Sequence, residues 1–133
     1  MRLVAIETKA LGTRPAKITA KCGGLIHFSK EACSRLSLKH QDQVLFFRDE
    51  EAPNAIYIAK AELGFGSPIR VYPGRTANCN QKTVADILLN LAGDSHTASY
   101  PVSSAMSIDG RTLVRILTES PISKNNKPYG NRP

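Results

Sequence analysis

The order of apolar and polar positions over 17–60 predicts strands packed around one short helix. Polar and apolar residues alternate over 17–22, and a second short apolar stretch follows at 25–28. A period of two is typical of half-buried strands. Gly23-Gly24 separates the two stretches, and tandem glycines supply the positive φ angles that a tight hairpin turn requires. We therefore predict a hairpin over 17–28.

A short helix is expected directly after this hairpin. Ser29 is a favourable N-cap, because its hydroxyl oxygen can accept a free backbone N–H of the first helical turn. Only about two turns of apolar spacing follow, which is too little for a helix to be stable without packing. Apolar stretches at 44–47 and 55–59, separated by turn residues at 51–54, then predict a second pair of strands.

The second half of the chain repeats this order of elements without repeating its residues. The expected elements are a strand at 56–61, a strand at 69–72, a polar connector at 73–82, a helix with the apolar stripe Val84, Ile87, Leu88 and Leu91, a strand at 100–108, a turn at Asp109-Gly110 and a strand at 112–117. Asn80 or Thr83 is expected to cap the helix start, and Gly93 its end. We therefore predict a mainly β fold with two short helices, β-barrel-like, with a possible internal pseudo-duplication.

Length and composition indicate a single small domain. The 133 residues, 41% of them hydrophobic, suffice for one core. We expect one compact domain at 1–119, built of half-units at about 17–60 and 56–119, and a flexible basic tail at 120–133. No apolar run approaches the roughly 18 residues of a membrane span, and the amino terminus does not resemble a signal peptide. No membrane association and a cytoplasmic location are the expectations.

The cysteines and histidines give no sign of a catalytic or metal site. Three cysteines at unrelated spacings do not form the pairs that a disulfide framework or a zinc site needs. We expect each of them to be buried and reduced. The three histidines lack metal-ligand spacing, and the serines lack a matched histidine and acid. We therefore expect no metal, no cofactor and no enzymatic activity.

Positive charge is concentrated near the two ends of the chain. The net charge is +7 overall, with +6 in residues 1–40, −3 in 41–62, +1 in 63–119 and +3 in the tail. A one-sided basic distribution attracts polyanions, of which nucleic acid is the commonest, although the same charge also serves solubility. The candidate nucleic-acid-binding residues, all of them basic, are Arg14, Lys17, Lys21, Lys30, Arg35 and Lys39.

The first half of the chain resembles the swapped-hairpin barrels of the AbrB/SpoVT family of transition-state regulators and antitoxins. The resemblance covers about 45 residues. It is carried by the glycine turn, the strand, the short helix, the leucine after it and the following strand, with Gly24, Ile26, Phe28, Leu36, Leu38, Asp42 and Val44 at matching places. Ser29 stands where the family usually has proline, Gln41 replaces a glycine, and Cys33 and Ser34 replace the basic residues in the helix.

The resemblance implies a dimer that exchanges hairpins and presents basic side chains to DNA. The leading functional hypothesis is a non-enzymatic DNA-binding protein of transcription-regulator or antitoxin type. The alternative is a structural or interaction module of a mobile element or virus particle, which uses the same fold for assembly with a protein partner. A homodimer and an internal pseudo-dimer, in which two half-units of one chain pack together, are both compatible with the sequence.

Overall fold

The predicted first hairpin is present in the computed structural model, which describes residues 16–61 and 66–122. Strand β1 (Lys17–Lys21) pairs antiparallel with β2 (Leu25–Phe28), and Gly23 and Gly24 have φ angles of 95° and 104°. A residue with a Cβ rarely adopts such angles, so the two glycines permit this turn. The alternating pattern thus gives one buried and one solvent-facing side to the hairpin.

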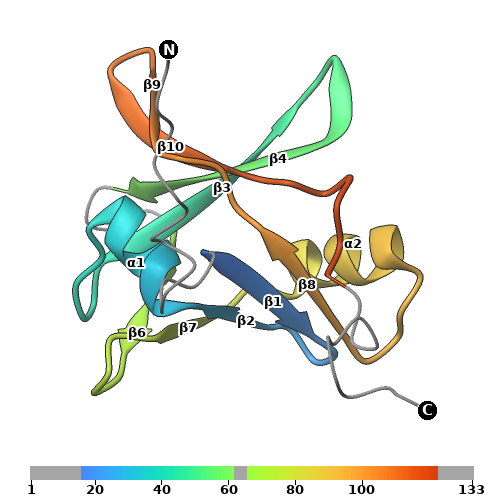
Figure 1. Ribbon diagram of the computed structural model, residues 1–133, viewed down its shortest axis with the longest axis horizontal. Coiled ribbons are helices and arrows are strands. Elements are labelled where there is room, and N and C mark those ends of the chain that lie inside the picture. Colours follow the sequence, from blue (N-terminus) through green and yellow to red (C-terminus); the bar gives the residue numbers. More distant parts are fainter. Residues whose placement is uncertain (1–15, 62–65, 123–133) are drawn as a thin grey trace, which may run out of the picture.

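The strands form two antiparallel sheets of five strands each (Figure 1). Sheet A has the order β6 (Arg70–Val71), β7 (Ala77–Asn80), β2, β1 and β8 (Thr97–Pro101). Sheet B has the order β5 (Ser67–Pro68), β3 (Gln43–Asp49), β4 (Ala52–Ala61), β10 (Arg111–Ile116) and β9 (Met106–Ile108). The mainly β fold with two helices is confirmed, but the strands of residues 16–61 and 66–122 make two sheets and no closed barrel.

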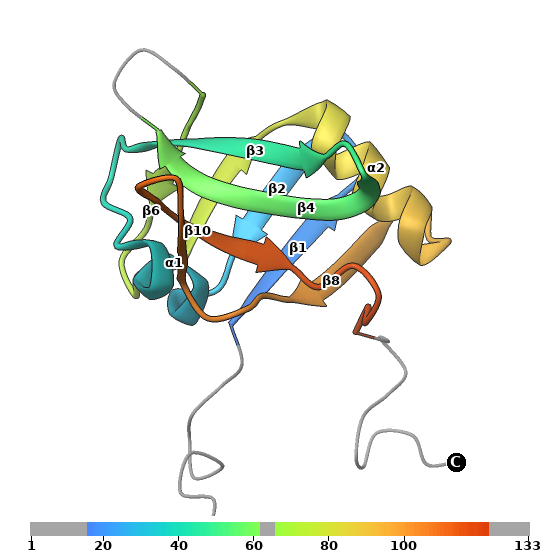
Figure 2. The ribbon, with the colours of Figure 1, turned by 90° about the horizontal axis from the view of Figure 1, so that it is seen from above.

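The two helices lie at opposite ends of the sheets (Figure 2). Helix α1 (Lys30–Leu36) begins at Ser29, whose Oγ accepts the Ala32 N–H at 3.2 Å as predicted. Helix α2 (Lys82–Ala92) ends at Gly93, also as predicted. The Tyr100 hydroxyl donates a hydrogen bond to the Leu88 carbonyl oxygen and so ties α2 to the inner side of sheet A.

Each sheet combines strands from both halves of the chain. In sheet A the β1–β2 hairpin pairs with the β6–β7 hairpin through β2 and β7. In sheet B the β3–β4 hairpin pairs with the β9–β10 hairpin through β4 and β10. The buried residues between the sheets form one hydrophobic cluster that includes Ile18, Phe28, Val44, Ile58, Leu88, Tyr100 and Ile116. The core is therefore shared by the two halves.

The prediction of a polar connector at 73–82 is wrong, because this segment contains strand β7. Ala77 and Cys79 face the core while Asn78 and Asn80 face outward, so the strand is amphipathic. Its side chains are small and its polar residues are asparagines, which are depleted in strands generally. Pairing with β2 along four residues outweighs this weak propensity.

The prediction of one long strand at 100–108 is also wrong. β8 ends at Pro101, and residues 102–105 carry the chain from sheet A to sheet B before β9 begins. Proline has no backbone N–H and therefore favours the end of a ladder. Two smaller differences from the predicted elements are that β4 begins at Ala52 and that Gln81 is the N-cap residue of α2, with no side-chain cap.

Within the described residues, no helix is long and apolar enough to cross a membrane.

The expectation that all three cysteines are buried holds for two of them. Cys33 and Cys79 are buried and Cys22 is exposed at the β1–β2 turn. Burial raises the pKa of the Cys33 thiol to about 11 and that of the Cys79 thiol to about 12. Since the thiolate is the reactive species, both buried groups are protonated and unreactive at neutral pH.

We expect one thiol per chain to react rapidly with Ellman's reagent at neutral pH, and three after denaturation. The Cys22→Ser variant should lose the rapid phase and keep the other two thiols. A rapid phase that survives in Cys22→Ser would contradict the burial of Cys33 and Cys79. The measurement is the absorbance of the released thiolate with time.

Candidate nucleic-acid interface

The outer side of sheet A is a polar surface that neither helix covers. Both helices pack on the inner side, where Tyr100 meets α2 and Ala32 of α1 is buried. The outward side chains of the five strands alternate with buried ones, and we call this surface the open face. Its residues are Lys17, Thr19, Lys21, Leu25, His27, Arg70, Asn78, Asn80, Thr97 and Ser99.

One row of polar residues crosses the open face from edge to edge. The strand register places Arg70, Asn78, His27, Thr19 and Ser99 opposite one another in turn. Thr19 Oγ1 and Ser99 Oγ are 2.7 Å apart, as are His27 Nδ1 and Asn78 Oδ1. A carbonyl oxygen only accepts, so His27 Nδ1 carries the proton of that bond. The row is therefore held in a defined geometry.

The open face is positively charged and carries no carboxylate. Lys17, Lys21 and Arg70 lie on it, and Arg75 lies in the β6–β7 turn. Segments 16–28, 66–81 and 97–101 contain no aspartate or glutamate. The ion pairs found among the described residues are Lys60–Asp42, Lys82–Asp86 and Arg115–Glu119. None of these pairs neutralises a cation of the open face.

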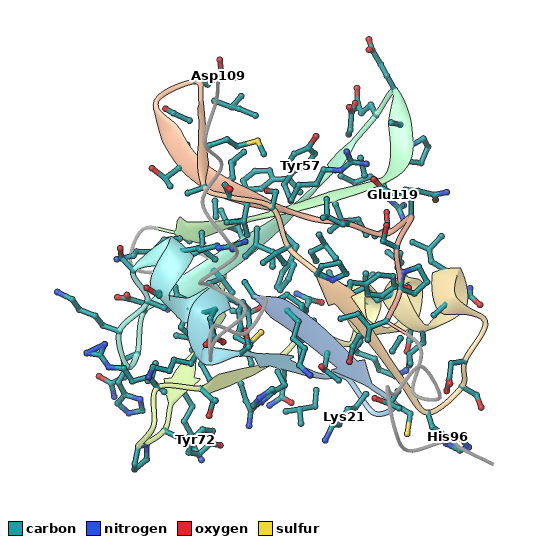
Figure 3. The ribbon with its side chains drawn as sticks, in the orientation of Figure 1. Lys21, Tyr57, Tyr72, His96, Asp109 and Glu119 are labelled. Atoms are coloured by element: carbon teal, nitrogen blue, oxygen red, sulfur yellow. The ribbon has the colours of Figure 1, made fainter. Side chains whose placement is uncertain are left out.

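Five acidic residues of the described part lie on the opposite side of the molecule: Asp49, Glu50, Glu51, Asp109 and Glu119. In Figure 3 Lys21 and Tyr72 lie along the lower side, while Asp109 and Glu119 lie on the upper side. Asp49, Glu50 and Glu51 are exposed around the β3–β4 turn of sheet B. The open face of sheet A is thus purely basic, whereas acidic and basic side chains are mixed on sheet B.

A pocket of about 450 Å³ opens at the β6 edge of the open face. It is lined by Leu25, His40, Arg70, Tyr72, Asn78 and Asn80, among others. The Asn78 amide donates from Nδ2 to the Tyr72 hydroxyl at 3.3 Å, and it accepts from His27 on its other side. The chain of bonds from His27 through Asn78 holds the Tyr72 ring beside the pocket. We call this the Tyr72 pocket.

A second hollow, which we call the basic groove, lies between α1 and the β6–β7 turn. Its basic lining residues are Lys30, Lys39, His40 and Arg75, and its apolar ones include Leu38 and Val71. No acidic residue lines it. His40 lines both the groove and the Tyr72 pocket, and its Nδ1 accepts the Val71 N–H at 3.2 Å. The two hollows therefore adjoin around strand β6.

The predicted nucleic-acid-binding residues separate into four groups, the last of which is Arg35 alone. Lys17 and Lys21 lie on the open face, and Lys30 and Lys39 line the basic groove. Arg14 is outside the described residues, as are residues 123–133 of the predicted tail.

Arg35 has a structural contact. Its Nη1 donates to the carbonyl oxygens of Val102 and Ser103 at 2.7 and 2.9 Å. These carbonyls lie where the chain crosses between the sheets, so Arg35 supports that crossing.

Sequence reasoning missed the contribution of the β6–β7 hairpin. Arg70, Arg75 and Asn78 belong to the surface, yet the sequence predicts one strand followed by a connector in this part of the chain. A usable signal was present, because residues 66–81 contain two arginines and no acid. Only the pairing of β7 with β2 places these residues beside Lys17 and Lys21.

The sequence matches no protein-family model, and no curated protein or solved structure is significantly similar to the chain.

Proposed function

We propose that this chain is a non-enzymatic DNA-binding protein that contacts the phosphate backbone through the open face and the basic groove. The supporting observation is that the cations of two hairpins lie on or beside the open face, whose strands carry no carboxylate, and that Lys30 and Lys39 line a groove next to it. Lysine and arginine bind DNA by releasing its condensed counterions. A regulator or antitoxin-type role is the form of this function that the family resemblance favours.

The arrangement of His27 agrees with a binding role. Its Nδ1 is bonded to the Asn78 amide, and not to a hydroxyl or thiol that it could activate as a nucleophile. Asparagine, threonine and serine side chains on the same row are hydrogen-bonding groups suited to phosphate, sugar and base edges. The row therefore supports recognition of a polar polymer.

Binding is expected to weaken steeply as salt rises. A labelled DNA, as duplex and as separated strand, is titrated with protein while fluorescence anisotropy is followed at about 50 and 200 mM salt. With about four to six phosphate contacts the affinity should fall on the order of 100-fold or more over this range. Absence of binding to either form at the lower salt would refute the proposal.

Assembly with a second copy of this chain is the second candidate function. The outer side of sheet B exposes Phe47 and Ile108, which are 36% and 44% accessible, within a hollow that Arg48, Asp49, Asp109 and Arg111 border. Two copies related by a two-fold axis can pair these opposite charges around the apolar centre. A defined dimer in the same buffers, together with no DNA binding, would favour this function over the first.

A further inference from the structure

We propose that the open face binds an unpaired DNA strand, with one base seated in the Tyr72 pocket and neighbouring phosphates on the cations around it. This inference rests on the proposed DNA-binding function and specifies the form of DNA that the site takes. It is carried by the width of the sheet, by the pocket and its tyrosine, and by the charge beside the pocket.

The width of sheet A argues against recognition of a duplex groove. Five strands spaced by about 4.8 Å span about 19 Å, whereas the major groove of B-DNA is about 12 Å wide and admits one helix or a two-stranded ribbon. Sheet A therefore cannot enter the groove with its open face. Helix α1 has only seven residues, and its Arg35 is occupied by backbone carbonyls. A splayed strand, by contrast, can lie across a sheet and expose its bases to it.

The Tyr72 pocket has the features that a single base requires. Its volume of about 450 Å³ lies within the range of small-molecule sites, roughly 300–1,000 Å³. Tyr72 is 38% exposed, and Asn78 fixes its hydroxyl, so its ring is presented in one orientation. Leu25 lines the same pocket and offers a second apolar contact. Among the described residues no hydrogen bond uses the Asn80 amide, which can pair with base edges.

The surrounding cations are placed to bind the phosphates on either side of that base. Arg70 lines the pocket itself, and the cations of the basic groove adjoin it at His40. From the pocket the polar row leads across the sheet to Thr19, between Lys17 and Lys21. A strand that follows this row passes from the basic groove to the lysines of β1 and meets no carboxylate of sheet A.

The test compares an oligodeoxythymidylate of about 16 nucleotides with a duplex of the same length in fluorescence anisotropy. The wild-type protein should bind the single strand at least about tenfold more tightly than the duplex. Tyr72→Ala should weaken single-strand binding about tenfold, as expected for loss of one stacked base. Tyr72→Phe keeps the ring and should bind within about twofold of wild type.

Tyr57→Ala is the matched control, because Tyr57 lies on sheet B, on the other side of the molecule (Figure 3). It should leave single-strand binding unchanged, and circular dichroism checks that both alanine variants are folded. Equal or tighter binding of the duplex, with no effect of Tyr72→Ala, would overturn this inference and leave the proposed function intact. No binding of either DNA at about 50 mM salt would overturn both.

Discussion

Replacing Lys17 and Lys21 together by glutamate is expected to weaken DNA binding roughly 100-fold at about 50 mM salt. Both side chains are exposed on the open face and belong to none of the ion pairs among the described residues. The change removes two phosphate contacts and adds two repelling carboxylates. The slope of log affinity against log salt should also become shallower by about 1.5, since each contact contributes about 0.7 to 0.9.

The control for this variant carries the same change of charge on the other sheet. Arg48→Glu with Arg111→Glu replaces two exposed cations of sheet B and should change the affinity by less than about threefold. The measurement is anisotropy of a labelled DNA over a series of salt concentrations. Equal losses for the two double variants would mean that net charge, and not the open face, governs binding.

Replacing Phe28 by alanine is expected to lower the free energy of unfolding by about 3–5 kcal/mol. Phe28 is fully buried on β2, where it lies opposite Ile18 of β1 and Ala77 of β7. Removing its ring loses buried apolar surface and leaves a cavity between the sheets. Since the free energy of unfolding of small domains is about 5–15 kcal/mol, a large part of the total stability would be lost.

Phe47→Ala is the control for the core substitution. Phe47 is 36% exposed on sheet B, where Arg111 lies 5.2 Å from the centre of its ring. A contact of this kind contributes about 0.5–1 kcal/mol at an exposed site, so the variant should remain close to wild type. Both variants are compared by urea unfolding followed by circular dichroism. A Phe28→Ala protein as stable as Phe47→Ala would contradict the placement of the core.

The sequence predicts the first half of the fold well, because its signals are local and strong. The alternation in β1, the two glycines after it and the capping hydroxyl of Ser29 each act within a few residues. Strand β7 is different, since its small and polar residues have little strand propensity of their own. It is a strand because it pairs with β2 and β6, and neither pairing can be deduced from a local pattern.

The residues of the candidate site also divide into those that a local pattern predicts and those that only the strand pairing brings to the site. Lys17 and Lys21 were predicted from the alternation, which shows that they share one side of a strand. Arg70, Tyr72 and Asn78 lie far along the chain and reach that side only through the β2–β7 pairing. Arg35 was assigned to DNA by its charge, and only the structure shows that the carbonyls of the crossing segment use it.

The sharing of both sheets between the two halves has a consequence for how the chain acquires its structure during synthesis. Sheet A needs β8 to reach its full width, and sheet B needs β10, the last strand described. Contacts so distant in sequence form slowly, because a long loop must close before they contribute. The nascent chain therefore cannot complete sheet A before β8, or sheet B before β10, has left the ribosome. Until then the edges of β1 and β4 remain available to chaperones or to neighbouring chains.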